Sequence, residues 1–108
     1  MKNQLLNIEI IRNYVLERKV DWTIHCLNRL NQRNISILDV KTAIKTGHII
    51  EYYYEDYPYP SCLILGLNID NKILHVVCGI SEGMVHMITA YYPNKNKWEN
   101  DMKTRRNK

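Results

Sequence analysis

The sequence is poor in the residues and motifs that mark several classes of protein. Its four glycines and three prolines are too few for a collagen-like or a low-complexity chain. No apolar run approaches the roughly 20 residues that a membrane-spanning helix needs, and the first residues have neither the apolar stretch nor the small-residue cleavage site of a signal peptide. A chain of 108 residues can build one hydrophobic core but not two. We therefore expect one globular domain without a membrane partner.

Cysteine is also scarce, and the common cofactor motifs are absent. The three cysteines form no Cys-x-x-Cys pair, and their odd number favours reduced thiols over a disulfide framework or a structural zinc site. The sequence contains no Walker loop, no glycine fingerprint for a dinucleotide and no paired spacing of metal ligands. These absences predict a cytoplasmic protein that uses neither a cofactor nor a metal.

The net charge of +4 comes entirely from the C-terminal end of the chain. Residues 1–94 carry nine Lys or Arg and nine Asp or Glu, whereas residues 95–108 carry six basic residues and two acidic ones. This distribution predicts a neutral domain over 1–94 and a basic tail over 95–108.

The tail has two interpretations. Its charges either keep the chain soluble, or Lys103, Arg105 and Arg106 bind the phosphates of RNA. Charge alone does not distinguish the two. We expect Trp98 to dock on the domain, because an exposed Trp at a frayed end would be unusual, and residues 103–108 to be mobile.

In the first half of the chain, apolar residues recur at the three- and four-residue spacing of an amphipathic helix. Asp21 is a suitable cap for the second helix, and Asn34 fits a left-handed residue at its end. Ser36 and Asp39 resemble a capping box for the third helix, which Gly47 would end with a positive φ. The three predicted helices run over about 3–18, 22–32 and 36–46.

After Gly47 the apolar spacing changes to two, which is the period of a strand. Helices followed by consecutive strands are typical of an α+β fold, here an antiparallel meander with the helices packed on one face. The four predicted strands run over about 48–54, 62–69, 72–80 and 84–92.

The turn before the third predicted strand sets its register. Asp70-Asn71 suits a two-residue hairpin, because both residues tolerate positive φ. This register pairs Leu65 with Val76 on the core face and places His75 opposite Gly66 on the other face.

The next turn has two possible lengths. A two-residue Glu82-Gly83 turn would require positive φ at Glu82, so we expect a three-residue loop over 81–83. The longer loop pairs Val76 with Ile88. It leaves His75 beside Thr89 and near Tyr91 on the face away from the core.

His25, Arg29 and Arg33 are spaced by four residues in the second predicted helix, so their side chains form one stripe. An imidazole beside two guanidinium groups suits an anion, because Arg offers a planar fork to phosphate oxygens and His exchanges protons near neutral pH. The alternative is a solvated helix face, or an Arg that pairs with Glu51 or Asp56.

His75 also has two interpretations. A histidine inside a strand is usually a structural residue with satisfied hydrogen bonds, but Thr89 and Tyr91 as neighbours make it a candidate acid or base. Glu51 alternates onto the same face as Tyr53. It could orient an Arg, act as a base or form a cross-strand salt bridge.

Several segments of the sequence resemble the bacterial domain of unknown function 4258. The resemblance covers nearly the whole chain and is weakest in residues 1–20 and in the tyrosine-rich loop. The matching segments include Trp22-Thr23-x-His25-x-x-x-Arg29-x-x-x-Arg33, Gly47-x-Ile49-Ile50-Glu51-x-Tyr53, Leu74-His75-Val76-Val77, Ile88-Thr89-Ala90-Tyr91-x-Pro93 and Trp98-Glu99-x-Asp101-x-Lys103-x-Arg105-Arg106.

The resemblance implies a fold and a function. Members of this family are similar in layout to the small toxins of bacterial toxin–antitoxin pairs, the RelE-like and BrnT-like ribonucleases. Some members are encoded beside a YgiT-type zinc-finger protein, the antitoxin type that partners the MqsR ribonuclease. The implied function is an RNA-cleaving toxin, held inactive by a zinc-finger or helix-turn-helix antitoxin encoded by the adjacent gene.

We therefore hypothesise a metal-independent endoribonuclease. His75 or His25 would act as general base or acid, Arg29 and Arg33 would hold the scissile phosphate, and Thr89 and Tyr91 would position it. The sequence leaves open whether the helix stripe and the His75 face meet. The second hypothesis is a non-catalytic module that binds protein or nucleic acid through an exposed sheet edge and the basic tail.

Overall fold

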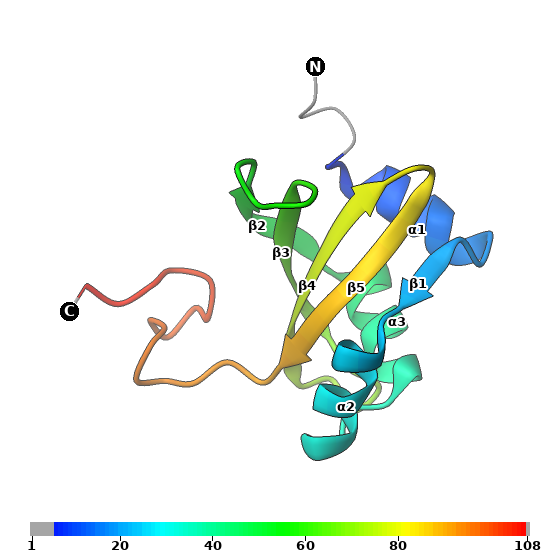
Figure 1. Ribbon diagram of the computed structural model, residues 1–108. Coiled ribbons are helices and arrows are strands. Elements are labelled where there is room, and N and C mark those ends of the chain that lie inside the picture. Colours follow the sequence, from blue (N-terminus) through cyan, green and yellow to red (C-terminus); the bar gives the residue numbers. More distant parts are fainter. Residues whose placement is uncertain (1–5, 108) are drawn as a thin grey trace.

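The computed structural model describes residues 6–107 and confirms the α+β class. The three helices lie on one side of a twisted sheet, and the C-terminal segment, residues 94–107, extends on the other side (Figure 1). No helix in this part of the chain has the length and apolarity needed to span a bilayer. In chain order the elements are α1 (Ile8–Leu16), β1 (Val20–Trp22), α2 (Ile24–Gln32), α3 (Ile37–Thr46), β2 (His48–Tyr53), β3 (Ser61–Leu67), β4 (Ile73–Ser81) and β5 (Met84–Tyr91).

The sheet has five strands in the order β1-β5-β4-β3-β2, not the four that we predicted. Strands β2 to β5 form the expected antiparallel meander, but β1 adds to it by pairing in parallel with β5. The sequence did not indicate β1 because three residues are too few to show a period of two. Asp21, our expected helix cap, lies within this strand, and Thr23 caps α2 instead.

The ends of the helices follow from local chemistry. The side chain of Asn7 accepts hydrogen bonds from backbone N–H groups in the first turn of α1, so the helix begins at Ile8. Residues 3–5, the first three of the predicted helix, lie outside the described residues. Asn34 has a φ of 56° after α2, as expected. The capping box of Ser36 and Asp39 is present at the start of α3, also as expected.

Two glycines bring α3 into close contact with the sheet. A Cβ atom on Gly66 would lie 1.9 Å from the carbonyl oxygen of Ala43, and one on Gly47 would lie 2.2 Å from the carbonyl oxygen of Leu65. Gly47 has a φ of −103°, so our expectation of a positive φ there is wrong. The reason for glycine at both positions is the short distance between backbones.

The loop between β3 and β4 is one residue longer than the two-residue hairpin that we predicted. Only Asn71 has a positive φ, of 64°. The N–H of Asn68 donates to the carbonyl of Lys72 at 2.8 Å, which closes a three-residue loop over 69–71. The side-chain oxygen of Asn68 accepts from the N–H groups of Asp70 and Lys72 and stabilises this loop.

The longer loop shifts the register of β3 by one residue, so our predicted pairing is wrong. Gly66 lies opposite Leu74 on the core face, and Leu65 lies opposite His75 on the other face. Ile64, and not Leu65, joins the core. Residues 62–67 are all apolar or glycine, so their pattern contained no alternation that could have selected the face.

The β4–β5 turn is the two-residue Glu82-Gly83 turn that we rejected. Glu82 has a φ of 55° and Gly83 a φ of 74°, and Ser81 pairs with Met84. Nearer the other end of the hairpin a β-bulge makes Ile88 an extra residue.

The bulge decides which residues of β5 face His75. Beyond the bulge, away from the Glu82-Gly83 turn, Val77 pairs with Thr89 and His75 pairs with Tyr91. His75 and Tyr91 therefore share the outer face, as expected, but they are direct partners, and Thr89 is not opposite His75 as we predicted.

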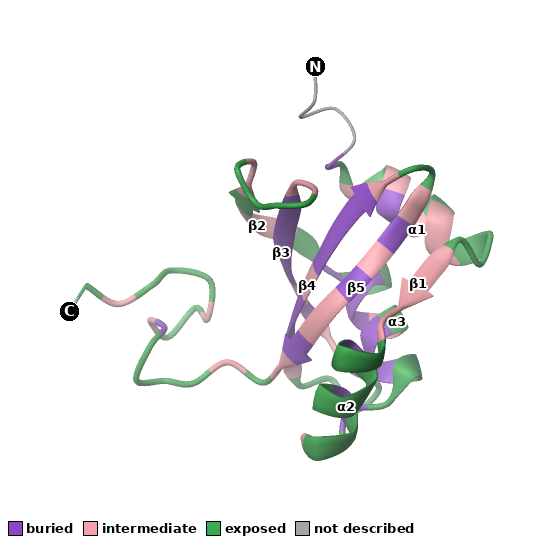
Figure 2. Cartoon of the chain, in the orientation of Figure 1, coloured by how far each residue is buried: buried purple, intermediate pink, exposed green. Residues whose placement is uncertain are grey.

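The hydrophobic core lies between the helices and one face of the sheet. Figure 2 shows the central strands buried, whereas most of α2 is exposed. Fully buried members of the core include Ile11, Val40, Ile44, Ile64, Leu74, Val76 and Met87.

Candidate functional site

The C-terminal segment folds back over the outer face of the sheet and covers His75. Trp98 is 2% exposed, and its ring meets the His75 ring edge-on with centroids 4.7 Å apart. An isolated bridge between Trp98 and Arg105 closes the segment on itself. The expected docking of Trp98 is confirmed, and as a result His75 is completely buried.

The contacts of His75 define its protonation. Its Nε2 lies 2.6 Å from the carbonyl oxygen of Met102, which can only accept, so Nε2 carries the hydrogen. Nδ1 is then free to accept from the hydroxyl of Tyr91, 3.4 Å away. Burial lowers the pKa of His75; the Met102 carbonyl and the charge of Glu51 oppose that shift only in part.

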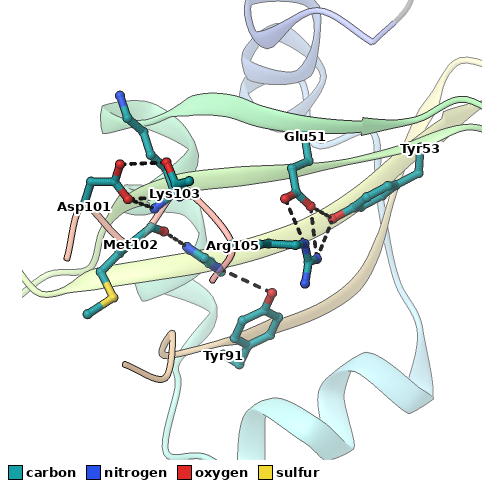
Figure 3. A network of polar contacts seen from close by, with 9 residues as sticks. Glu51, Tyr53, Tyr91, Asp101, Met102, Lys103 and Arg105 are labelled. Carbon is teal, nitrogen blue, oxygen red and sulfur yellow. Dashed lines mark hydrogen bonds and ion pairs between the residues drawn. The ribbon is translucent and has the colours of Figure 1, made fainter. Parts of the chain in front are cut away.

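Beside this histidine lies a second polar cluster that joins strand β2 to the C-terminal segment (Figure 3). Arg105 donates two hydrogen bonds to the carboxylate of Glu51, at 2.9 and 3.1 Å, and its guanidinium lies 4.5 Å from the centre of the Trp98 ring. The hydroxyl of Tyr53 donates to the same carboxylate. The geometry is a fork of Arg on a carboxylate with an aromatic ring behind it.

The charges of this cluster are fixed by its hydrogen bonds. Burial works to raise the pKa of Glu51, but the hydrogen bonds from Arg105 and Tyr53 outweigh it and hold that pKa below its ordinary value. Burial, together with the bond to Glu51, raises the pKa of Tyr53 to about 12. At neutral pH Glu51 is therefore ionised and Tyr53 keeps its proton.

Arg33 connects helix α2 to the same region. Its Nη1 donates to the hydroxyl of Thr89 at 3.0 Å and to the carbonyl of Ala90 at 2.8 Å, both on β5. No carboxylate among the described residues pairs with Arg33. Thr89 therefore positions a guanidinium whose charge is not neutralised by a neighbour.

These elements enclose a pocket of about 350 Å³ at the end of β5. Three of its lining residues are cations, none is acidic, and three are aromatic. Such a pocket suits an anion attached to a flat ring, because guanidinium and ammonium groups bind phosphate and aromatic faces stack on bases. The lining residues are Arg33, Tyr91, Tyr92, Asn94, Lys97, Trp98 and Arg105.

The structure brings together some of the residues singled out from the sequence. Arg33, Tyr91 and Arg105 line the pocket, Thr89 holds Arg33, and His75 lies behind Tyr91. The helix stripe and the outer face of the sheet thus meet, but only at the last residue of the stripe.

The other candidates lie outside the pocket lining. His25 and Arg29 are exposed on α2, and Lys103 is exposed in the C-terminal segment. Arg106 donates to the carbonyl of Lys95 and to Glu99, and Arg105 to Glu51. Arg105 and Arg106 are therefore held in place, and our expectation of a mobile arm is wrong for both.

Sequence reasoning missed three pocket residues, namely Tyr92, Asn94 and Lys97. The signal that could have found them was the expected docking of Trp98: a buried Trp brings the residues before it onto the domain. Among residues 6–107, no three His, Cys, Asp or Glu side chains lie close enough together to hold a metal ion.

Comparison with known proteins gives a family but no characterised relative. A family model described as a domain of unknown function, DUF4258, matches residues 22–92. That range contains the three helix-stripe residues, His75 and Tyr91, and it excludes the C-terminal segment. No curated protein and no solved structure matches the chain. Since the family model covers well over half of its residues, the chain belongs to the DUF4258 family.

Proposed function

We propose that this protein is a metal-independent endoribonuclease that holds a phosphate of RNA in the pocket between α2, β5 and the C-terminal segment. The observation that supports it is the lining itself: it contains Arg33, Lys97 and Arg105, and of these three Arg105 alone pairs with a carboxylate of the described residues, that of Glu51. Arg33 has no carboxylate partner among the described residues, so a phosphate would provide its missing counter-charge. The RelE-like layout implied by the sequence resemblance is consistent with this activity, as an analogy of fold.

Cleavage without a metal needs a group that takes the proton of the 2′-hydroxyl. Tyr91 lines the pocket, and its hydroxyl points at the unprotonated Nδ1 of His75. In the proposed step the 2′-hydroxyl gives its proton to Tyr91 as Tyr91 gives its own to His75, and the 2′-oxygen attacks phosphorus. The distance of 3.4 Å is long for a hydrogen bond, and such contacts commonly shorten when substrate binds.

The remaining atoms complete the reaction. The bond from phosphorus to the 5′-oxygen breaks, and the leaving oxygen takes a proton that the ammonium group of Lys97 can supply. Arg33 and Arg105 stabilise the charge that develops on the phosphate oxygens. The products are a 2′,3′-cyclic phosphate and a 5′-hydroxyl.

The test is cleavage of RNA by the purified full chain in the presence of a chelator. The wild-type protein is expected to give 2′,3′-cyclic phosphate ends, and Arg33→Gln to slow the reaction by about 10²–10³-fold, as for loss of one group that stabilises the transition-state charge. Lys41→Gln, on the exposed side of α3, is the matched control and is expected to cleave like wild type. No cleavage by wild type, or equal cleavage by Arg33→Gln, would contradict the proposal.

One observation favours the second hypothesis, a non-catalytic binding module. His75 is fully buried and both of its ring nitrogens have partners, as in a structural histidine. In that case the pocket would bind RNA without changing it. Intact RNA that remains bound to wild-type protein in chelator would support this function over the nuclease.

We also propose that the protein is the toxin of a toxin–antitoxin pair, with a zinc-finger or helix-turn-helix antitoxin encoded next to it. This rests on the family resemblance. Expression of the chain alone is expected to stop growth, and co-expression of the neighbouring gene to restore it. Two separate size-exclusion peaks for the co-expressed proteins at micromolar concentration would count against this pairing.

A further inference from the structure

The pocket uses only Arg33 of the basic stripe that follows helix α2. His25 and Arg29 are exposed, whereas Arg33 is partly buried at the pocket. The exposed surface of α2 is visible in Figure 2. The helix contains no Asp or Glu, and no carboxylate among the described residues pairs with Arg29. His25, Arg29 and Arg33 therefore form a row along α2 in which both arginines lack a carboxylate partner among the described residues.

The spacing of these side chains along α2 matches the spacing of phosphates along a nucleic-acid strand. Each step of four residues advances about 6 Å along a helix and turns by about 40°, which is comparable to the distance between neighbouring phosphates of a nucleic-acid strand. Asn28 and Gln32 are exposed on the same side of the helix and offer amide groups to the strand. One phosphate on each of Arg33, Arg29 and His25 is thus a geometric match.

The lining and the volume of the pocket favour single-stranded over duplex RNA. Its walls include Tyr91 and Tyr92, and Tyr92 is 40% exposed, whereas Trp98 is covered by its contacts with His75 and Arg105. A base reaches such rings only when it is unstacked from its neighbours. A volume of about 350 Å³ also leaves no room for a second strand.

From these observations we infer that α2 is the binding track of single-stranded RNA. The strand enters the pocket at Arg33, and its next two phosphates lie on Arg29 and His25. This inference rests on the proposed function of the pocket and adds the substrate class and the path of the chain outside it.

The experiment measures affinity without cleavage. Non-cleavable 2′-O-methyl oligonucleotides of one to four nucleotides are titrated against the full chain at several salt concentrations. Wild type is expected to bind the tetranucleotide at least tenfold more tightly than the mononucleotide, with extension at one end of the strand giving the gain. Arg29→Gln is expected to weaken tetranucleotide binding by about five- to tenfold, to flatten the salt slope by about 0.7, and to leave mononucleotide binding unchanged.

The controls separate this inference from the proposed function. Lys41→Gln removes an exposed charge from α3 and is expected to change neither affinity. Two results would contradict RNA binding along α2: equal affinities of wild type for one and for four nucleotides, or an affinity of Arg29→Gln for the tetranucleotide equal to that of wild type. Failure of wild type to bind the mononucleotide would instead contradict phosphate binding in the pocket. Affinity that rises with oligonucleotide length, without any cleavage of RNA, would contradict the nuclease activity but support RNA binding along α2.

Discussion

His75 is the residue on which the proposed chemistry of the site depends. It is buried under Trp98, its Nε2 is fixed by the carbonyl of Met102, and its Nδ1 faces the hydroxyl of Tyr91. These contacts are compatible with two roles of His75: a structural histidine, or an acceptor of the proton from Tyr91. Measurements of stability and of activity distinguish these two roles.

The lowered pKa of His75 predicts how stability depends on pH. In the unfolded chain a histidine has a pKa of about 6.5, so between that value and the lower folded pKa the unfolded state binds more protons. The contribution of His75 to the free energy of unfolding is therefore complete above about pH 6.5 and decreases as the pH falls. Urea unfolding at several pH values between 7 and 5 should show a shallower decrease for His75→Gln than for wild type. Parallel decreases would contradict a buried neutral histidine.

Single residues were predictable from the sequence where their chemistry was local. The capping box of Ser36 and Asp39 and the left-handed Asn34 depend only on their neighbours in the chain. The contacts of Arg33 with Thr89, and of Arg105 with Glu51, join residues 56 and 54 positions apart. No local pattern specifies which of several arginines makes such a contact.

At the scale of elements, the turns determined which side chains meet. A one-residue difference in the β3–β4 loop moved Leu65 from the predicted core face to the outer face. The bulge at Ile88 then brought Tyr91 directly opposite His75. Strand positions followed from periodicity, but registers depended on turn geometry that the side chains specify weakly.

The positive φ of Glu82 is conformationally unfavourable, and a substitution can remove this free-energy cost. Glu82 has a φ of 55°, which is unfavourable for Glu and well tolerated by Asn, and Asn-Gly is a preferred pair for a two-residue hairpin. Glu82→Asn is expected to raise the free energy of unfolding by about 0.5–1 kcal/mol. Chemical denaturation measures this change, with Asp70→Asn in the β3–β4 loop, at the opposite end of β4, as the control. A lower free energy of unfolding for Glu82→Asn than for wild type would contradict the two-residue turn with a positive φ at residue 82.

The contact between α3 and β3 allows no side chain at Gly66. A Cβ there would meet the backbone of Ala43, which cannot move without displacing the helix. Gly66→Ala is expected to lower the free energy of unfolding by about 1–3 kcal/mol or more. An effect below about 0.5 kcal/mol, as for a surface site, would mean that α3 and β3 lie farther apart.

For the whole molecule, the main difference from our expectation is the C-terminal segment. Trp98 is buried against His75, as expected, but Arg105, which we expected in a mobile arm, pairs with Glu51. The segment supplies Asn94, Lys97, Trp98 and Arg105 to the pocket. The family match over residues 22–92 does not include these residues, so the site combines the family domain with a segment beyond it.

Removing the anchor of the segment should therefore affect the whole fold. Trp98→Ala is expected to lower the free energy of unfolding by about 3–5 kcal/mol, as for other buried large aromatic residues. That is a large part of the roughly 5–15 kcal/mol that stabilises a domain of ordinary size. Urea unfolding of this variant against Lys103→Ala, an exposed residue of the same segment, tests the prediction. Similar stabilities of the two variants would mean that the segment does not pack on the sheet.

In the proposed function, Tyr91 moves the proton during cleavage of an RNA held in the pocket. The most direct measurement is the single-turnover rate of RNA cleavage in chelator for wild type and Tyr91→Phe. The variant keeps the ring and loses only the hydroxyl. We expect a rate about 10²–10⁴-fold lower for Tyr91→Phe, with unchanged affinity for a non-cleavable RNA. Equal rates for the two proteins would contradict it.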